Sequence, residues 1–182
     1  VNQDVVDKMV DQGLITLTGE STIENAWLAL IPNYQAGEVV AIKVSFNNSH
    51  DDAGSVNSID AIIEPVNAII RGLNLLGVPN SSIVVYDSSR WIPLRFINGC
   101  DYDGIVYRYK AHDPWGEGSE AVEFDPPGTN AFTQQLSKEV ALANYLINVP
   151  VLKAHGMTKI ILALKNHYGS IEKPSDLQQW ST

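Results

Sequence analysis

The sequence contains very little cysteine, and this limits the chemistry that the chain can support. Cys100 is the single cysteine among 182 residues, so the chain has no internal disulfide and no cysteine set for an iron–sulfur cluster or a zinc site. A lone cysteine is more often a small buried apolar residue than a nucleophile. We therefore expect any function to depend on other side chains.

Basic residues are also scarce relative to acidic ones. Twelve Lys and Arg stand against 21 Asp and Glu, which gives a formal net charge of −9. A surface with this much negative charge repels phosphate backbones and anionic lipid. We therefore expect no nucleic-acid partner. No apolar run approaches the ~18 residues that a membrane span needs, so no span is predicted. The sequence does not distinguish a cytoplasmic protein from one that is exported and loses a leader peptide.

The signatures of several familiar enzyme classes are missing. The sequence has no P-loop and no Rossmann glycine fingerprint, because Gly116 and Gly118 do not follow a predicted strand. It also has no Gly-x-Ser-x-Gly elbow. Simple nucleotide-binding and serine-hydrolase functions therefore lack support, and the sequence identifies no cofactor.

The first half of the chain alternates between helical and strand patterns. Residues 1–17 and 22–30 have apolar residues at helical spacing. Short β-branched runs at 39–46 and 82–86 predict strands that are buried on both faces, and residues 58–76 between them predict a helix. Strand, helix and strand in this order form one βαβ unit.

The second half has weaker patterns. They predict a strand at 104–109, an acidic loop at 113–128, a helix at 129–144 and a strand at 145–152. Pro150 predicts a sheet edge or a bulge, and residues 157–164 favour a helix over a strand. The expected fold is a single α/β domain over residues 1–182, with a mainly parallel sheet and helices on both faces in a Rossmann-like, three-layer arrangement.

Polar residues follow the predicted strands, where ligands gather in open parallel sheets. Residues 148–170 are the richest stretch, because Lys153, Lys159 and Lys165 are three of the twelve basic residues and two of the four histidines lie beside them. Cations at the ends of buried elements suggest an anionic ligand or a reacting carbonyl. The predicted ligand-binding residues are Lys43, Asn47, Asp87, Arg90, Lys165, Asn166 and His167.

Lys153 and His155 are the predicted catalytic residues, because on an extended segment they share one face. A lysine desolvated beside a second cation has a lowered pKa and can act as a base or a nucleophile. The same pair can instead hold a carboxylate or phosphate as counter-charges, and we favour anion binding over covalent chemistry. A metal held by His155, His167 and Asp87 matches no known ligand spacing, so no metal site is predicted.

Several candidates also have a purely structural interpretation. Lys43 can mark the point where a strand leaves the core, and Asp87 can turn the chain after its strand. Arg90 can simply pair with Asp87, and Asn166 can end a helix. The acidic stretch at 101–125 fits a solvated loop better than a calcium site, because the EF-hand spacing is absent.

Four blocks of sequence resemble a known family. They are similar to blocks of the prokaryotic family catalogued as domain of unknown function 362, and they read LINVPVLKAHG at 146–156, ALKNHYG at 163–169, VAIKVSFN at 40–47 and VVYDSSR at 84–90. Ser45 stands where that family more often has Asn. Some relatives carry ferredoxin-like iron–sulfur domains, so the resemblance implies a redox partner. Relatives continue past the equivalent of this chain's last block, which implies that residues 1–182 are the N-terminal part of a longer domain.

Two functions are therefore expected to compete. The first is binding of an anionic small molecule at the C-terminal ends of the strands through Lys, His and Asn, and it leaves open whether the domain is itself an enzyme that acts on that molecule. The alternative is a non-catalytic binding or redox-accessory domain, holding an anion or a metal, in an iron–sulfur-associated system. A stable domain whose cations only cap its elements is the third hypothesis.

Overall fold

The helices and strands of the first half follow the predicted order. The computed structural model describes residues 1–54, 59–124, 132–155 and 159–173. In chain order its elements are α1 (Gln3–Thr18), α2 (Ile23–Leu30), β1 (Val40–Lys43), α3 (Glu64–Leu75), β2 (Ile83–Asp87), α4 (Leu94–Ile97), β3 (Val106–Tyr109), β4 (Glu120–Phe124), β5 (Phe132–Leu136), α5 (Lys138–Ala141), β6 (Tyr145–Asn148), β7 (Lys153–His155), β8 (Lys159–Ile161) and α6 (Ala163–Asn166). Three 3-10 turns, η1 (Asn80–Ser82), η2 (Lys110–His112) and η3 (His167–Ser170), connect them.

The N-terminal helices begin and end at residues whose chemistry suits those positions. The Asn2 side chain accepts a hydrogen bond from the Val5 amide, and α1 ends at Gly19 in the left-handed region. Thr22 caps α2 by accepting a hydrogen bond from the Asn25 amide. Because Pro65 suits a first helical turn, α3 begins at Glu64, later than the predicted start at residue 58.

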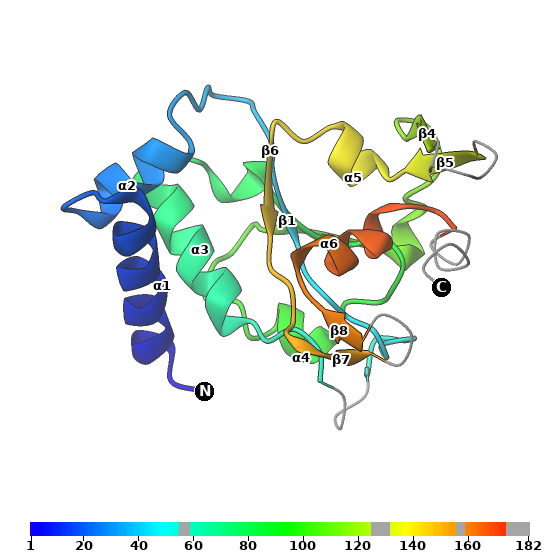
Figure 1. The fold of residues 1–182 in the computed structure, drawn as a ribbon, viewed down its shortest axis with the longest axis horizontal. Helices are drawn as coiled ribbons and strands as arrows, with labels where there is room; N and C mark the ends of the chain where they lie inside the picture. Colours follow the sequence, from blue (N-terminus) through cyan, green and yellow to red (C-terminus); the bar gives the residue numbers. More distant parts are fainter. Residues whose placement is uncertain (55–58, 125–131, 156–158, 174–182) are drawn as a thin grey trace.

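A four-stranded parallel sheet forms the centre of the molecule, in the order β3-β2-β1-β6 (Figure 1). Lys43 at the end of β1 lies opposite Tyr86 of β2 on one side and Asn148 of β6 on the other. Because all four strands are parallel, their C-terminal ends share one edge, termed here the carboxyl edge. β6 is an outer strand that ends before Pro150, which agrees with the predicted sheet edge.

Alternation along β1 and β2 separates the two faces of the sheet. One face carries the hydrophobic core, where Val40, Ile42, Val44, Ile83 and Val85 pack with Trp27 of α2 and with Val66, Ile70 and Leu73 of α3. Figure 1 shows α1, α2 and α3 together on this side. Lys43 and Tyr86 alternate with these core residues and are fully buried on the other face, where side chains of α6 and η3 contact them.

The predicted helix at 129–144 is wrong over most of its described length. Phe132–Leu136 forms β5, which pairs antiparallel with β4, and only Lys138–Ala141 is helical. β4 itself lies within the predicted acidic loop, and residues 125–131 lie outside the described part. Pairing between two short consecutive strands decides this region, and such pairing overrides local spacing.

The preference for a helix at 157–164 is also wrong in part. Lys159–Ile161 forms β8, which pairs antiparallel with β7, and α6 begins only at Ala163. Residues 156–158 lie outside the described part. No helix in the described part of the chain is long and apolar enough to cross a membrane.

Candidate functional site

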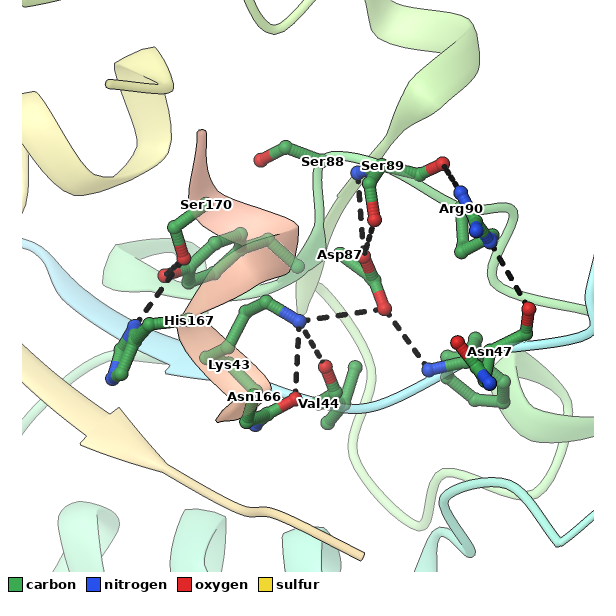
Figure 2. A network of polar contacts seen from close by, with 12 residues as sticks. Lys43, Val44, Asn47, Asp87, Ser88, Ser89, Arg90, Asn166, His167 and Ser170 are labelled. Atoms are coloured by element: carbon green, nitrogen blue, oxygen red, sulfur yellow. Dashed lines mark hydrogen bonds and ion pairs between the residues drawn. The ribbon is translucent and has the colours of Figure 1, made fainter. Parts of the chain in front are cut away.

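A buried ion pair between Lys43 and Asp87 lies at the centre of the carboxyl edge (Figure 2). Each residue is the last of its strand, and the parallel register of β1 and β2 brings both ends together. Lys43 Nζ lies 3.3 Å from Asp87 Oδ2, and the two side chains are only 1% and 4% exposed. The structure therefore brings these two residues, both predicted from the sequence, into contact.

The Lys43 ammonium is saturated by internal acceptors. Besides Asp87, it donates to the Val44 carbonyl oxygen and, over 3.3 Å, to Asn166 Oδ1. Three N–H groups therefore meet three acceptors. Burial lowers the pKa of Lys43, because desolvation penalises the charged form more than the attraction of Asp87 favours it.

Asp87 has both of the roles that its position suggests. Its Oδ2 accepts from the Phe46 amide over 2.9 Å, which fixes the loop after β1. Its Oδ1 accepts from the amide and the hydroxyl of Ser89, over 3.3 and 3.1 Å, which forms a turn after β2. The carboxylate therefore turns the chain and also neutralises Lys43.

Asn166 connects α6 to two strands of the sheet. Its Nδ2 donates to Asn148 Oδ1 of β6 over 2.7 Å and to the Lys43 carbonyl oxygen over 3.3 Å. Asn148 in turn donates to the Ala163 carbonyl oxygen. The side chain is 4% exposed and makes more contacts than a helix end requires. Asn166 thus holds α6 against the carboxyl edge.

Gly169 closes the covering turn η3 directly over the ion pair. A Cβ at this position would lie 2.8 Å from both Lys43 Nζ and Asp87 Oδ1, closer than real Cβ atoms come to other atoms. Only glycine therefore fits here without displacement. This close approach gives a physical reason for the glycine that ends the 163–169 block.

A chain of hydrogen-bonding groups extends from the ion pair towards the surface. Tyr86 Oη lies 3.0 Å from Ser170 Oγ, which lies 3.3 Å from Nδ1 of the half-buried His167. Burial and then the charge of Lys43 lower the pKa of His167. Burial raises the pKa of Tyr86, and its carboxylate neighbours add to this. The sequence predicted His167 here, but it did not predict Tyr86 or Ser170.

A second carboxylate lies buried on the same face. Ser88 Oγ donates to Glu139 Oε2 over 3.3 Å, and both residues are buried. Glu139 is in the first turn of α5, where the helix dipole favours a negative charge. Glu139 was not among the predicted site residues, because its region was predicted to lie within a long helix at 129–144.

Arg90 and Asn47 connect the loops that follow β1 and β2. Arg90 Nε donates to the Asn47 carbonyl oxygen over 3.1 Å, and its Nη1 donates to the Ser89 carbonyl oxygen over 2.9 Å. Arg90 therefore does not form the ion pair with Asp87 that the structural interpretation of the sequence offered, and it bonds to backbone carbonyl oxygens instead. The Asn47 amide donates to Asp60 Oδ1 over 2.9 Å.

Lys153 forms a second lysine–aspartate pair beside the first. Its Nζ donates to the Ile59 carbonyl oxygen over 2.7 Å and lies 3.8 Å from Asp60 Oδ1. Its charged neighbour is thus a carboxylate, whereas the catalytic hypothesis needs a second cation. The His155 side chain lies outside the described part, although its backbone belongs to β7. The catalytic roles of Lys153 and His155 stay predictions.

Lys165 is a cation without an acceptor among the described residues. Its Nζ lies 3.6 Å from the centre of the Tyr168 ring, and partial burial lowers its pKa. Among the described residues, no group of three or more His, Cys, Asp and Glu side chains is arranged to hold a metal ion.

The comparison with family models finds a match, which covers most of the chain. A model described as Domain of unknown function (DUF362) matches residues 40–181. Neither the curated proteins nor the solved structures contain a match. The matched range starts at β1 and includes the ends of β1 and β2 together with α6 and η3. The chain is a member of the DUF362 family, an α/β domain whose function is not characterised.

Proposed function

We propose that this chain binds an anionic small molecule at the carboxyl edge, around the Lys43–Asp87 pair. The observation that carries the proposal is the complete burial of a lysine at the end of a parallel strand. Desolvating an ammonium group is costly, and strongly perturbed ionisable groups concentrate at functional sites. Parallel sheets bind their ligands at this edge.

The side chains of this site divide into two groups. Lys43, Asp87 and Asn166 have partners inside the protein, so they position the surrounding loops. Lys165 and His167 are only half-buried and are the groups that would contact a ligand. Lys165 supplies the charge, since its ammonium has no acceptor in the described part of the chain.

Binding without covalent chemistry agrees best with the state of Lys43. The three N–H groups of the Lys43 ammonium are all engaged by acceptors, so its nitrogen has no lone pair with which to attack a carbonyl carbon or accept a proton. If the chain is an enzyme, a group other than Lys43 transfers the proton. The redox-accessory alternative is supported by the family resemblance alone.

We also propose that the sheet belongs to a Rossmann-like layered arrangement. Two observations support this: the parallel order β3-β2-β1-β6, and the position of α6 on the face opposite α3. An experimental structure in which the face carrying Lys43 has no helical cover would contradict it.

A thermal-shift screen with phosphate, acetate, citrate and divalent metals tests the binding proposal. A ligand at one hundred times its Kd stabilises the folded state by about 2.7 kcal/mol. For a chain of this size that corresponds to roughly 5–10 °C in Tm. Lys165→Ala and His167→Gln should reduce the response.

Lys8→Ala serves as the matched control, because it removes the same charge from an exposed position on α1. The control should respond like the unaltered protein. Equal responses from all four proteins would refute a ligand at the carboxyl edge.

A further inference from the structure

We propose that His167 is a neutral hydrogen-bond donor that offers its Nε2–H to a carbonyl, carboxylate or phosphate oxygen of the ligand. Its tautomer is set from inside the protein by Tyr86 and Ser170. The role towards a ligand rests on the proposed function, but the hydrogen-bond chain is a property of the protein alone.

The three groups form an unbranched chain. Tyr86 is fully buried, and its phenol oxygen Oη has Ser170 Oγ as its single hydrogen-bond partner among the described residues. Ser170 is 2% exposed, and its hydroxyl has Tyr86 Oη and His167 Nδ1 as its partners in the same part of the chain. Figure 2 shows the imidazole of His167 with one ring nitrogen joined to Ser170.

The direction of the chain follows from the buried end. Burial and the carboxylates of Asp87 and Glu139 keep the Tyr86 hydroxyl protonated by raising its pKa. Its hydrogen has one available acceptor, Ser170 Oγ, so Tyr86 donates. The Ser170 hydrogen then points to His167 Nδ1, which must be unprotonated to accept it. In a neutral imidazole the remaining hydrogen is on Nε2.

The opposite direction is unfavourable. If His167 Nδ1–H donated to Ser170 and Ser170 donated to Tyr86, the Tyr86 hydrogen would be buried without an acceptor. Protonating Nδ1 either forces this reversal or makes Ser170 Oγ accept from both neighbours, which leaves the buried Ser170 hydrogen without an acceptor among the described residues. In both cases it adds a second positive charge near Lys43. The other charged groups around the chain are Asp87, which Lys43 already neutralises, Glu139 near Tyr86, and Lys165 on α6.

A neutral donor discriminates between classes of ligand. A protonated Nε2 has no lone pair for a metal ion and cannot act as a general base. It can donate to an oxygen that carries or develops negative charge, without the cost of burying another full charge beside Lys43. The ligand class is therefore an oxyanion or a carbonyl compound.

The hydrogen-bond chain can be tested without any ligand, by nitrogen-15 NMR of the full chain. The sequence has four histidines, and His167→Gln assigns the resonances by their loss. At a pH where the imidazoles are neutral, we expect His167 to be protonated at Nε2. Ser170→Ala should raise the His167 pKa, because the neutral ring loses its donor.

Ser88→Ala is the matched control, since it removes an equally buried hydroxyl that bonds to Glu139 instead. It should leave the His167 titration unchanged. A proton on Nδ1 in the unaltered protein, or a lower pKa in Ser170→Ala, would overturn the assignment. The measurement on the unaltered protein decides the tautomer even if Ser170→Ala does not fold.

Titration with inorganic phosphate and with acetate tests the role towards a ligand. The Nε2–H resonance of His167 should move downfield on binding, and His167→Gln should weaken binding about tenfold, the value of one net hydrogen bond. Binding that leaves this resonance unmoved would overturn the inference and leave the proposed function intact. If neither anion binds, the ligand role fails, while the tautomer result stands separately.

Discussion

The two lysine–aspartate pairs at the carboxyl edge differ in how they are held. The backbone amides of the consecutive residues Phe46 and Asn47 donate to Asp87 and Asp60, respectively. Lys43 lies 3.3 Å from Asp87, with side chains 1% and 4% exposed, and Lys153 lies 3.8 Å from Asp60, with side chains 9% and 1% exposed. The first pair joins the ends of two adjacent strands, and the second joins the first residue of β7 to the loop before α3.

The partners of the two aspartates show the same difference. Both oxygens of Asp87 accept hydrogen bonds, from Phe46 and from Ser89. Asp60 leaves its buried Oδ2 without a hydrogen-bond partner in the described part of the chain. The first pair is therefore fully hydrogen-bonded, whereas the second leaves one buried acceptor unsatisfied, which costs stability. Similar residues thus form a fully satisfied pair in one place and a partly satisfied pair in the other.

Lys43→Met should cause the largest loss of stability. It leaves Asp87 charged and buried without its cation, which costs about 3–5 kcal/mol of unfolding free energy. Urea denaturation followed by circular dichroism measures this loss. The double variant Lys43→Met with Asp87→Asn should recover part of it. A loss smaller than that of Lys153→Met would reverse the comparison.

Gly169→Ala should have the next largest effect. The added Cβ meets Lys43 Nζ and Asp87 Oδ1 at 2.8 Å, and overpacking of this kind costs roughly 1–3 kcal/mol. The control is Gly13→Ala in the middle of α1, where no atom lies within 4 Å of the new methyl group. That control should stabilise the protein by about 0.5–1 kcal/mol. Equal Tm values for both variants would show that η3 does not seal the ion pair.

Lys153→Met should cost less than either change, about 1–2 kcal/mol, the order of one hydrogen bond from a charged donor. The loss is smaller than for Lys43 because the longer distance, 3.8 Å against 3.3 Å, makes the attraction between Lys153 and Asp60 weaker than that between Lys43 and Asp87. The same urea measurement applies. A loss equal to that of Lys43→Met would mean that the two pairs are held equally firmly.

The smallest expected effect is a pH dependence from His167. Its pKa is lowered in the folded state, so the unfolded chain binds more protons between the folded value and about 6.5. Stability should therefore rise with pH through this window and be lost as the pH falls through the folded pKa. Unfolding free energies between pH 5 and pH 8 should show a shallower slope in His167→Gln. An unchanged slope would assign the dependence to other groups.

The meeting of Lys43 and Asp87 could be predicted from the sequence. Apolar runs ending at these residues predict neighbouring parallel strands, and parallel strands bring their ends together. The sequence could not decide whether Lys43 reaches into a site or marks the point where the strand leaves the core. The side chain that covers Lys43 belongs to Asn166, which lies 123 positions later in the chain. Only the folded structure shows that Asn166 and Gly169 enclose it.

The short antiparallel pairs were beyond prediction for a related reason. β4 and β5 are five-residue strands, and β7 and β8 have three residues each. Within so few residues the helical and strand periods are hard to tell apart, and the choice depends on a partner strand. The same lack of local signal concealed Glu139, whose importance follows from Ser88 on another element.

The bonds to Phe46 and Asn47 also have an energetic consequence. Two carboxylates accept from the amides of neighbouring residues, so the backbone that follows β1 is held from both sides, by Asp60 and by Asp87. The two lysine–aspartate pairs therefore share one short piece of backbone, and substitutions at Asp60 and at Asp87 should not be additive in their effect on stability.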